Sequence, residues 1–230
     1  MIENAIPHAG ALEIQSAGER LWLLPERAAY WPRRDTLLIA DAHLGKAAAF
    51  RRAGIPVPSG TTDENLQRLT GLIEALRPEC IVFLGDMLHS RVARTSSAAG
   101  FQRWREQHSP IDMTLVRGNH DRHAGDPPGA WRVDCVDDPL LVDGLALCHL
   151  PRAVPGHYAI AGHAHPAARF AGRGGQHLRL PCFLFTADYA ILPAFGPFTG
   201  MSDIEPRSGD GVYVVAGDRV ITAGYDGSMT

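Results

Sequence analysis

Several short apolar runs in this chain stop at, or just before, a residue that can bind a metal ion. Runs of this length, bounded by glycine or polar residues, indicate buried strands because helices need longer apolar patterns. The runs and the segments after them are 36–40 before Asp41-Ala42-His43, 80–84 before Gly85-Asp86, and 113–116 before Gly118-Asn119-His120-Asp121. Metal-binding residue types at strand ends therefore constrain both the fold and the chemistry of this chain.

Helical patterns separate these strands. Between the first two, apolar residues recur at helical spacing at Leu66, Leu69, Ile73 and Leu76. Thr61 and Glu64 have the spacing of a capping box, and Pro78 ends the pattern. A second helix is expected over residues 98–108, before the third strand. Strands that alternate with helices predict β-α-β units and an α/β fold.

The second half of the chain is rich in strands. The predicted strands cover residues 145–148, 158–161, 178–184, 189–195, 212–215 and 219–221. The first two end at His149 and at Gly162-His163-Ala164-His165. The last two are expected to form a closing hairpin around a Gly217-Asp218 turn. Another hairpin is expected over residues 11–24.

Composition limits the class of protein. The chain has 230 residues, 45% hydrophobic and 20% charged, which is ordinary for a globular protein and fits a single domain over residues 1–230. A net charge of −3 excludes a strongly basic protein that coats nucleic acid. The sequence shows no signal-peptide or membrane-span pattern, so we expect a cytoplasmic protein with no membrane partner. Its four cysteines form no C-x-x-C pair, so no zinc knuckle is indicated.

The segments at the strand ends supply carboxylate, amide and imidazole groups but no thiolate. The seven candidate ligands are Asp41, His43, Asp86, Asn119, His149, His163 and His165. Such donors suit hard or borderline divalent cations, of which we expect manganese, with iron, zinc or magnesium as alternatives. Seven donors are too many for one tetrahedral site, so the set predicts two divalent metal ions.

The placement of these residues suggests how they meet. Loops at the carboxyl edge of a sheet converge on one crevice. Because residues i and i+2 of a continuing strand share a face, we expect Asp41 with His43, and His163 with His165, to point at the same site. Glycines precede three of the segments, where we expect them to allow a sharp turn; they are Gly85, Gly118 and Gly162.

At this point the residues show a resemblance to a known family. The blocks that resemble the ordered signature of calcineurin-like metallophosphoesterases are Asp41-x-His43, Gly85-Asp86, Gly118-Asn119-His120-Asp121, His149 and Gly162-His163-x-His165. A narrower resemblance, to the ligase-associated DNA damage response endonucleases called PdeM, lies in residues 41–52, 54–58, 117–122 and 192–200. One departure is His89, because many metallophosphoesterases carry Asp three residues after the aspartate that corresponds to Asp86.

The resemblance implies a fold and a set of ligand roles. The fold is a four-layer α-β-β-α sandwich of two mixed sheets, with the active site at the carboxyl ends of the strands. The implied ligands are Asp86 as the bridge between two cations, Asp41, His43 and His165 on one of them, and Asn119, His149 and His163 on the other. A hydroxide that bridges the metals would attack phosphorus in line. His43 acting mainly near the substrate is the alternative.

The remaining polar residues suggest roles toward the substrate. His120 is left free as a general acid for the leaving oxygen, which suits imidazole, and Asp121 is expected to orient it. Asn119 can also offer its NH₂ group to a phosphate oxygen. Arg122, Lys46 and Arg52 are candidates for binding substrate phosphates. The alternative for residues 46–52 is an ordinary amphipathic surface segment with basic side chains.

These patterns lead to one function and to rivals. The expected function is a metal-dependent phosphodiesterase or endonuclease that acts on DNA in repair, and the resemblance implies DNA ligase and helicase repair proteins as partners. A general phosphatase or a nucleotide phosphodiesterase would use the same chemistry. A scaffold protein with weak or no catalysis is the rival from a different class, and the complete ligand set argues against it.

Overall fold

The computed structural model describes residues 8–52, 54–56, 61–91, 98–171, 176–197 and 199–223. Residues 57, 58 and 198 of the motif stretches, and the side chain of Thr61 in the expected capping box, lie outside the described part. No helix in these ranges is both long and apolar enough to cross a membrane.

The first sheet contains the strands that lead to the candidate ligands of the first half of the chain. Its strands are β1 (Leu12–Ser16), β2 (Glu19–Leu24), β3 (Ala28–Trp31), β4 (Thr36–Ile39), β5 (Cys80–Leu84), β6 (Asp112–Val116) and β7 (Asp134–Val136), in that spatial order. Neighbours from β1 to β4 pair antiparallel, and neighbours from β4 to β7 pair parallel. The parallel strands β4, β5 and β6 therefore end at the same edge.

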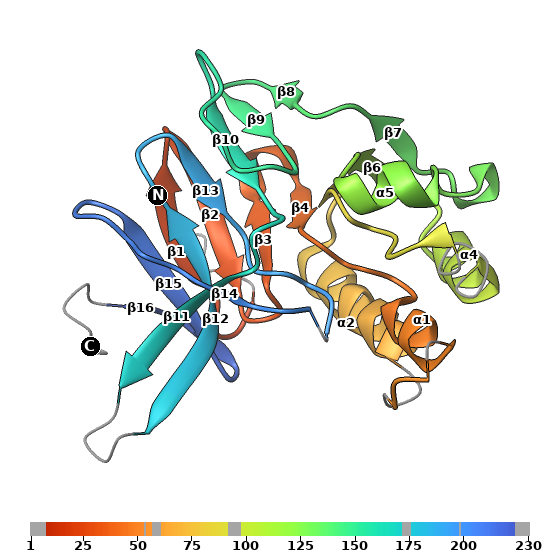
Figure 1. The fold of residues 1–230 in the computed structure, drawn as a ribbon. Helices are drawn as coiled ribbons and strands as arrows, with labels where there is room; N and C mark the ends of the chain where they lie inside the picture. Colours follow the sequence, from red (N-terminus) through yellow and green to blue (C-terminus); the bar gives the residue numbers. More distant parts are fainter. Residues whose placement is uncertain are drawn as a thin grey trace.

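Helices cover one face of this sheet (Figure 1). They are α1 (Lys46–Arg52), α2 (Thr61–Leu76), α4 (Ala98–Gln107) and α5 (Asn119–Ala124), with short 3-10 turns η1 (Pro32–Arg34) and η2 (Gly129–Trp131). Leu69 and Ile73 of α2 pack in one buried cluster with Phe83 of β5 and Phe101 of α4. The apolar residues that recur at helical spacing in the sequence thus form the face of α2 that packs on the sheet.

The second sheet supplies the histidines of the second half. Its strands are β8 (Leu140–Val142), β9 (Leu145–Leu147), β10 (Tyr158–Ala161), β11 (Pro166–Ala171), β12 (His177–Phe185), β13 (Tyr189–Ile191), β14 (Ser202–Asp203), β15 (Gly211–Ala216) and β16 (Arg219–Thr222). Strands β9, β10 and β13 pair parallel, and most of the remaining pairs are antiparallel. Both sheets are therefore mixed.

The two sheets pack face to face through a continuous apolar core. Leu38, Val82 and Trp31 of the first sheet share a buried cluster with Ile160 and Phe183 of the second. Burial of such side chains, each contributing about 1.5–3 kcal/mol, fixes the sheets against each other. The ends of β4, β5 and β6 are thereby held beside the ends of β9 and β10.

The structure confirms the predicted fold of two mixed sheets with helices, and it refines the layer count. The predicted strands, the two hairpins and both helices are present, although β13 is shorter than expected. Within the described residues, however, helices lie on only one side of the sandwich (Figure 1). The outer face of the second sheet is closed by side chains of its own strands and of loop residues such as Ile204. The expected fourth, helical layer is therefore not found in the described part, because its strands are joined there without a crossover helix.

Candidate metal centre

The loops after β4 and β5 run side by side beyond the sheet. The backbone N–H of Asp41 donates to the Gly85 carbonyl (3.3 Å), and that of His43 donates to the Asp86 carbonyl (2.9 Å). Asp41 and His43 both have left-handed backbone conformations, with φ of 51° and 45°. Strand β4 has already ended at Ile39. The strand geometry that we expected to aim both side chains at one face is therefore wrong, although the side chains do meet.

Three clusters of possible ligand atoms form where these loops meet the ends of β9 and β10. The first cluster is Asp41, His43 and His165, the second is Asp86, His149 and His163, and the third is His43, His89 and His120; within each, the atoms lie within 4.8 Å of one another. His163 and His165 are both left-handed, with φ of 68° and 47°, and lie in the second and the first cluster respectively. They do not follow the geometry of a continuing strand, but both point into the same site, where the resemblance assigns them to different cations.

The first cluster holds buried polar atoms without a hydrogen-bond partner in the described residues. They are Asp41 Oδ1, His43 Nδ1 and His165 Nε2. Nδ1 of His165 lies 3.0 Å from the Gly200 carbonyl, to which it can only donate. Its Nε2 therefore carries a lone pair in the neutral ring and faces Asp41 Oδ1 at 3.5 Å. Two acceptors that face each other in a buried space fit a cation between them.

The second cluster also brings ligand atoms together, here at hydrogen-bond distances. Nδ1 of His149 donates to the Leu84 carbonyl at 3.1 Å, which fixes the ring and leaves the Nε2 lone pair to face the cluster. That Nε2 lies 2.8 Å from Asn119 Oδ1, 3.0 Å from His163 Nδ1 and 3.5 Å from Asp86 Oδ1. Asn119 is thereby joined to the second cluster. Electron-pair donors at these distances again suit a divalent cation.

Asp41 and Asp86 connect the clusters to the backbone around them. Asp41 Oδ2 accepts the backbone N–H of His163 at 2.7 Å. The same carboxylate is a member of the first cluster and fixes the backbone of a residue in the second. Asp86 Oδ1 accepts the backbone N–H of His120 at 2.9 Å. Burial raises the pKa of Asp86, while the neighbouring His149 lowers it. Both carboxylates are nearly inaccessible to solvent, so their charge needs a partner.

Glycines are required here because ligand side chains pass close to the backbone. A Cβ at Gly85 would lie 2.1 Å from His149 Nδ1, one at Gly118 2.2 Å from Asp86 Oδ1, and one at Gly162 2.6 Å from Asp41 Oδ2. Of these three, only Gly85 has a left-handed φ, of +78°. The lack of a Cβ is therefore needed at all three positions, and a left-handed conformation only at Gly85.

His120 lies at the open side of the second cluster. Its side chain is 39% exposed, and its Nε2 is 3.9 Å from Asp86 Oδ2. Its Nδ1 donates to the His89 carbonyl at 3.0 Å. Asp121 does not contact it as expected, because the two carboxylate oxygens of Asp121 accept the backbone N–H groups of Leu88 and Gly118, each at 3.0 Å. His89, rather than Asp121, orients the imidazole of His120.

His89 is the site residue to which the sequence assigned no role. Its ring stacks on that of His120, with centroids 5.2 Å apart, and it meets the ring of His43 edge to face at 5.6 Å. Burial, followed by the charges of Lys46 and His120, lowers the pKa of His89 to about 4. The signal that could have found it was its position, three residues after Asp86, where the family commonly has Asp.

The basic residues proposed for the substrate lie at different distances from the clusters. Lys46 at the start of α1 is near enough for Asp41 and Asp86 to raise its pKa, although burial lowers that pKa overall. Arg52 is exposed in the last turn of α1. Arg122 is exposed and pairs with Asp137 at 3.6 Å. Among the described residues, neither arginine forms a hydrogen bond or ion pair with the clusters.

Comparison with known proteins identifies the family. The model of the calcineurin-like phosphoesterase family matches residues 35–167, which is more than half of the chain and includes all seven candidate ligands. The chain belongs to the calcineurin-like phosphoesterases. Members of this fold use divalent metal ions, and the clusters described above provide groups that fit them.

Solved structures extend the comparison. A crystal structure of the nuclease MPE of Pseudomonas putida is 40% identical to this phosphoesterase, covers 93% of its chain and 100% of that chain, and has a TM-score of 0.82. A protein of unknown function from Aquifex aeolicus is 21% identical over 61% of this chain and 81% of that chain (TM-score 0.40). The phosphoesterase Yfce of E. coli is 15% identical over 84% and 95% (TM-score 0.38). None of the curated proteins matches this chain.

The charge state of the histidines reflects their burial in this phosphoesterase. Burial, and then Lys46 and the neighbouring histidines, lower the pKa of His43 to about 2. Burial and His149 also lower the pKa of His163. At His165 burial acts downward, but the nearby Asp41 carboxylate raises the pKa overall. Neutral imidazole is the form that binds metal, so His43 and His163 are prepared for it.

We expect Gly85→Ala to destabilise the protein and weaken metal binding together. The added Cβ would meet His149 Nδ1 at 2.1 Å in a left-handed backbone, which costs roughly 2–4 kcal/mol in unfolding free energy. Gly71→Ala on the exposed side of α2 is the control, because its Cβ would meet nothing within 4 Å. Denaturant unfolding and manganese titration measure both effects, and equal affinity in Gly85→Ala and wild type would contradict this account of the glycine.

The metal-free protein should lose stability as the pH falls below 6.5. His43 has a folded pKa of about 2, so below its ordinary value of 6.5 the unfolded state binds a proton that the folded state does not. The slope for this residue is at most about 1.4 kcal/mol per pH unit. Urea unfolding from pH 7 to 4 measures it, and His43→Asn should flatten the curve. His177→Asn, at an exposed position, should leave it unchanged; an unaltered slope in His43→Asn would disprove the assignment.

Proposed function

We propose that this phosphoesterase is a dinuclear, metal-dependent phosphodiesterase that cleaves DNA, with manganese as its metal and DNA repair as its setting. The observation that carries the proposal is the pair of adjacent clusters of ligand atoms, linked by the Asp41 carboxylate, with three buried atoms of the first cluster left without a hydrogen-bond partner. The likeness to a protein described as a nuclease, over nearly the whole of both chains, supports a polymeric substrate.

In this proposal Asp41, His43 and His165 hold one cation. Asp86, His149, His163 and Asn119 would hold the second. Two bound divalent cations supply a water of lowered pKa and neutralise the charge of the phosphoryl oxygens. Leu84 and Gly200 support the ligands, because their carbonyls fix the tautomers of His149 and His165.

His120 has the geometry of a proton donor to the leaving oxygen. Because its Nδ1–H donates to the His89 carbonyl, Nε2 is left to face the clusters. Nε2 carries a transferable proton in the imidazolium form, and loss of that proton leaves a neutral ring that keeps the hydrogen bond to His89. The stacked ring of His89 restricts the tilt of His120. His89 acts through His120 and is a positioning residue.

Lys46 supports binding of an anionic substrate. It stands at the first turn of α1, close to both buried carboxylates, and its ammonium lies 5.8 Å from the ring centre of Phe50. The positive charge of Lys46 reduces the electrostatic repulsion between an anionic phosphodiester and the two aspartates. Arg52 and Arg122 remain predicted phosphate contacts for a longer substrate. DNA ligase and helicase proteins remain predicted partners.

The first experiment asks which ester is cleaved. After treatment with EDTA the protein should be inactive, and manganese should restore hydrolysis of both bis(p-nitrophenyl) phosphate and a DNA oligonucleotide. Magnesium, zinc and iron(II) are compared at equal concentration. Cleavage of the monoester p-nitrophenyl phosphate alone would replace the nuclease proposal with a general phosphatase, and cleavage of small diesters without DNA would favour a nucleotide phosphodiesterase.

The second experiment separates metal binding from proton transfer. His120→Ala should keep its metal content but lose roughly 10²- to 10⁴-fold in turnover on DNA. The loss on bis(p-nitrophenyl) phosphate should be smaller, because p-nitrophenolate leaves without a proton. Asp86→Ala should lose both metal and activity, and His177→Ala is the control. Equal losses of His120→Ala on the two substrates would count against the acid role.

A further inference from the structure

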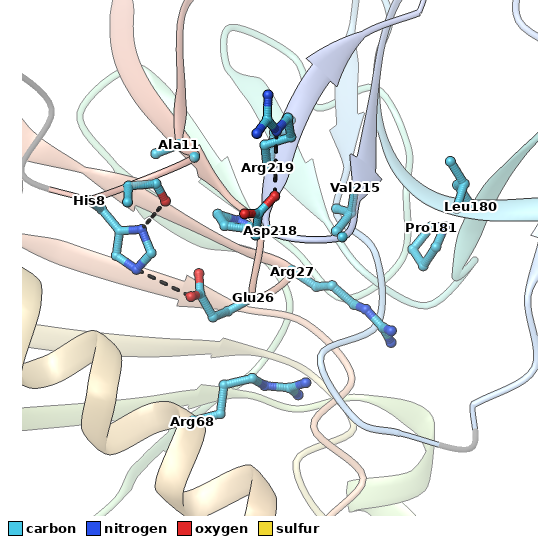
Figure 2. Close-up of a pocket in the computed structure, with 15 residues that line it drawn as sticks. His8, Ala11, Glu26, Arg27, Arg68, Leu180, Pro181, Val215, Asp218 and Arg219 are labelled. Atoms are coloured by element: carbon cyan, nitrogen blue, oxygen red, sulfur yellow. Dashed lines mark hydrogen bonds and ion pairs between the residues drawn. The ribbon is translucent and has the colours of Figure 1, made fainter.

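A cavity of about 1010 Å³ opens between the first turn of the chain, helix α2 and the closing hairpin of the second sheet. Its lining includes Arg27 from the β2–β3 turn, Arg68 from α2 and Arg219 from β16. Figure 2 shows the side chains of Arg27 and Arg68 extending in the same direction from these two elements. The sequence assigned no functional role to the residues of this cavity.

The positive charge at this position is only partly neutralised. Arg219 pairs with Asp218 at 3.4 Å, and Glu26 pairs with His8 at 3.3 Å. Arg27 has no side-chain hydrogen bond or ion pair among the described residues. Nε of Arg68 is buried and has no hydrogen-bond partner there either. Arg27 thus keeps donors available in this cavity, and it lies near enough to Arg68 for the two charges to interact.

Arg68 is held rigidly in this arrangement. Its guanidinium lies 3.9 Å from the ring centre of Phe195, and it donates to the Phe195 carbonyl and to Asn65 Oδ1. Burial, followed by the charge of Arg27, lowers the pKa of Arg68 to about 10. It therefore remains a cation at neutral pH, beside a second cation. An anion between them would relieve the repulsion and fill the open donor positions.

The cavity shares part of its wall with a smaller cavity that reaches the candidate metal centre. A second cavity, of about 370 Å³, is lined by His165 of the first cluster and by Pro193 and Thr199. Arg27 and Pro181 line both cavities. The backbone between them is tied to the site, because the N–H of Gly196 donates to the Asp41 carbonyl at 3.0 Å. Arg27 therefore borders both the cavity that contains Arg68 and the cavity that contains His165 of the first cluster.

We propose that Arg27 and Arg68 form a phosphate-binding subsite that holds the backbone of a nucleic-acid strand at a phosphate other than the one being cleaved. The inference rests on the proposed function, because it assigns the strand a direction away from the metal centre. Arginine is suited to this task, since its planar fork of donors matches phosphate oxygens. The subsite lets a chain with net charge −3 hold a polyanion through local charge.

The test uses manganese-loaded wild type, Arg27→Ala, Arg27→Lys and Arg103→Ala. Arg27→Ala is chosen because Arg68 also packs on Phe195 and its removal could disturb the fold. Arg103, exposed on α4, gives the matched loss of charge elsewhere. Steady-state kinetics are measured on a single-stranded DNA oligonucleotide and on bis(p-nitrophenyl) phosphate, which has no neighbouring phosphate.

We expect Arg27→Ala to raise KM for the oligonucleotide by about tenfold or more, with kcat and the activity on bis(p-nitrophenyl) phosphate unchanged. The slope of log KM against log salt should fall by about one phosphate contact. Arg27→Lys should recover part of the loss, and Arg103→Ala should behave as wild type. Equal effects of Arg27→Ala and Arg103→Ala on the oligonucleotide would overturn the proposal.

Two further arms separate the sources of phosphate and the two proposals. If Arg27→Ala weakens inhibition by inorganic phosphate but leaves KM for the oligonucleotide unchanged, the cavity binds a free anion and the strand subsite is wrong.

Binding of a labelled phosphorothioate oligonucleotide, whose ester bonds hydrolyse slowly, is followed by fluorescence anisotropy. Weaker binding by Arg27→Ala in a protein that cleaves no DNA supports the subsite and refutes the proposed function. If the protein cleaves DNA but Arg27→Ala and wild type bind the oligonucleotide equally, the proposed function is supported and the subsite is refuted.

Discussion

The candidate site depends on electron-pair donors being held against one another in a buried space. Asp41 Oδ1 faces His165 Nε2, and His149 Nε2 faces Asn119 and Asp86. Where neither of two facing atoms carries a proton, as at Asp41 and a neutral His165, their lone pairs repel in a medium of low dielectric constant. The apolar core between the sheets, on one side, and the core beneath the helices, on the other, hold the loops in place despite this cost. A positive charge in the clusters relieves this repulsion. The fold therefore favours binding of a cation, whichever metal supplies it.

Much of the scaffold could be predicted because its signals are local. Short apolar runs located β4, β5, β6, β9 and β10, and the helical spacing of leucines located α2. The same runs identified the residues after each strand, and the structure gathers them at one edge. That edge follows from parallel pairing of β4, β5 and β6, which the alternation of strands and helices indicates.

The rest could not be predicted because it depends on contacts between distant segments. Nothing near Asp41 or His163 in the sequence indicates a left-handed conformation, which the surrounding loops impose. The need for Gly118 arises from Asp86, more than thirty positions earlier in the chain. Asp121 was assigned to His120 because the two are adjacent, but its oxygens bind backbone N–H groups of Leu88 and Gly118. Strands β3, β7 and β8 are short and lack clear alternation, so their pairing partners define them.

Because the loops that carry the ligand residues arise from both sheets, the side chains packed between the sheets set the distance between those residues. Leu38 and Val82 come from the sheet that supplies Asp41 and Asp86, and Phe183 comes from the sheet that supplies the loop histidines. A methylene group added or removed at this interface changes the gap between the sheets by a fraction of an ångström. Because the first and second clusters each take ligands from both sheets, the same change reaches the distances between the ligand atoms within a cluster. Hydrophobic residues far from any substrate can therefore set which ionic radius the centre accommodates.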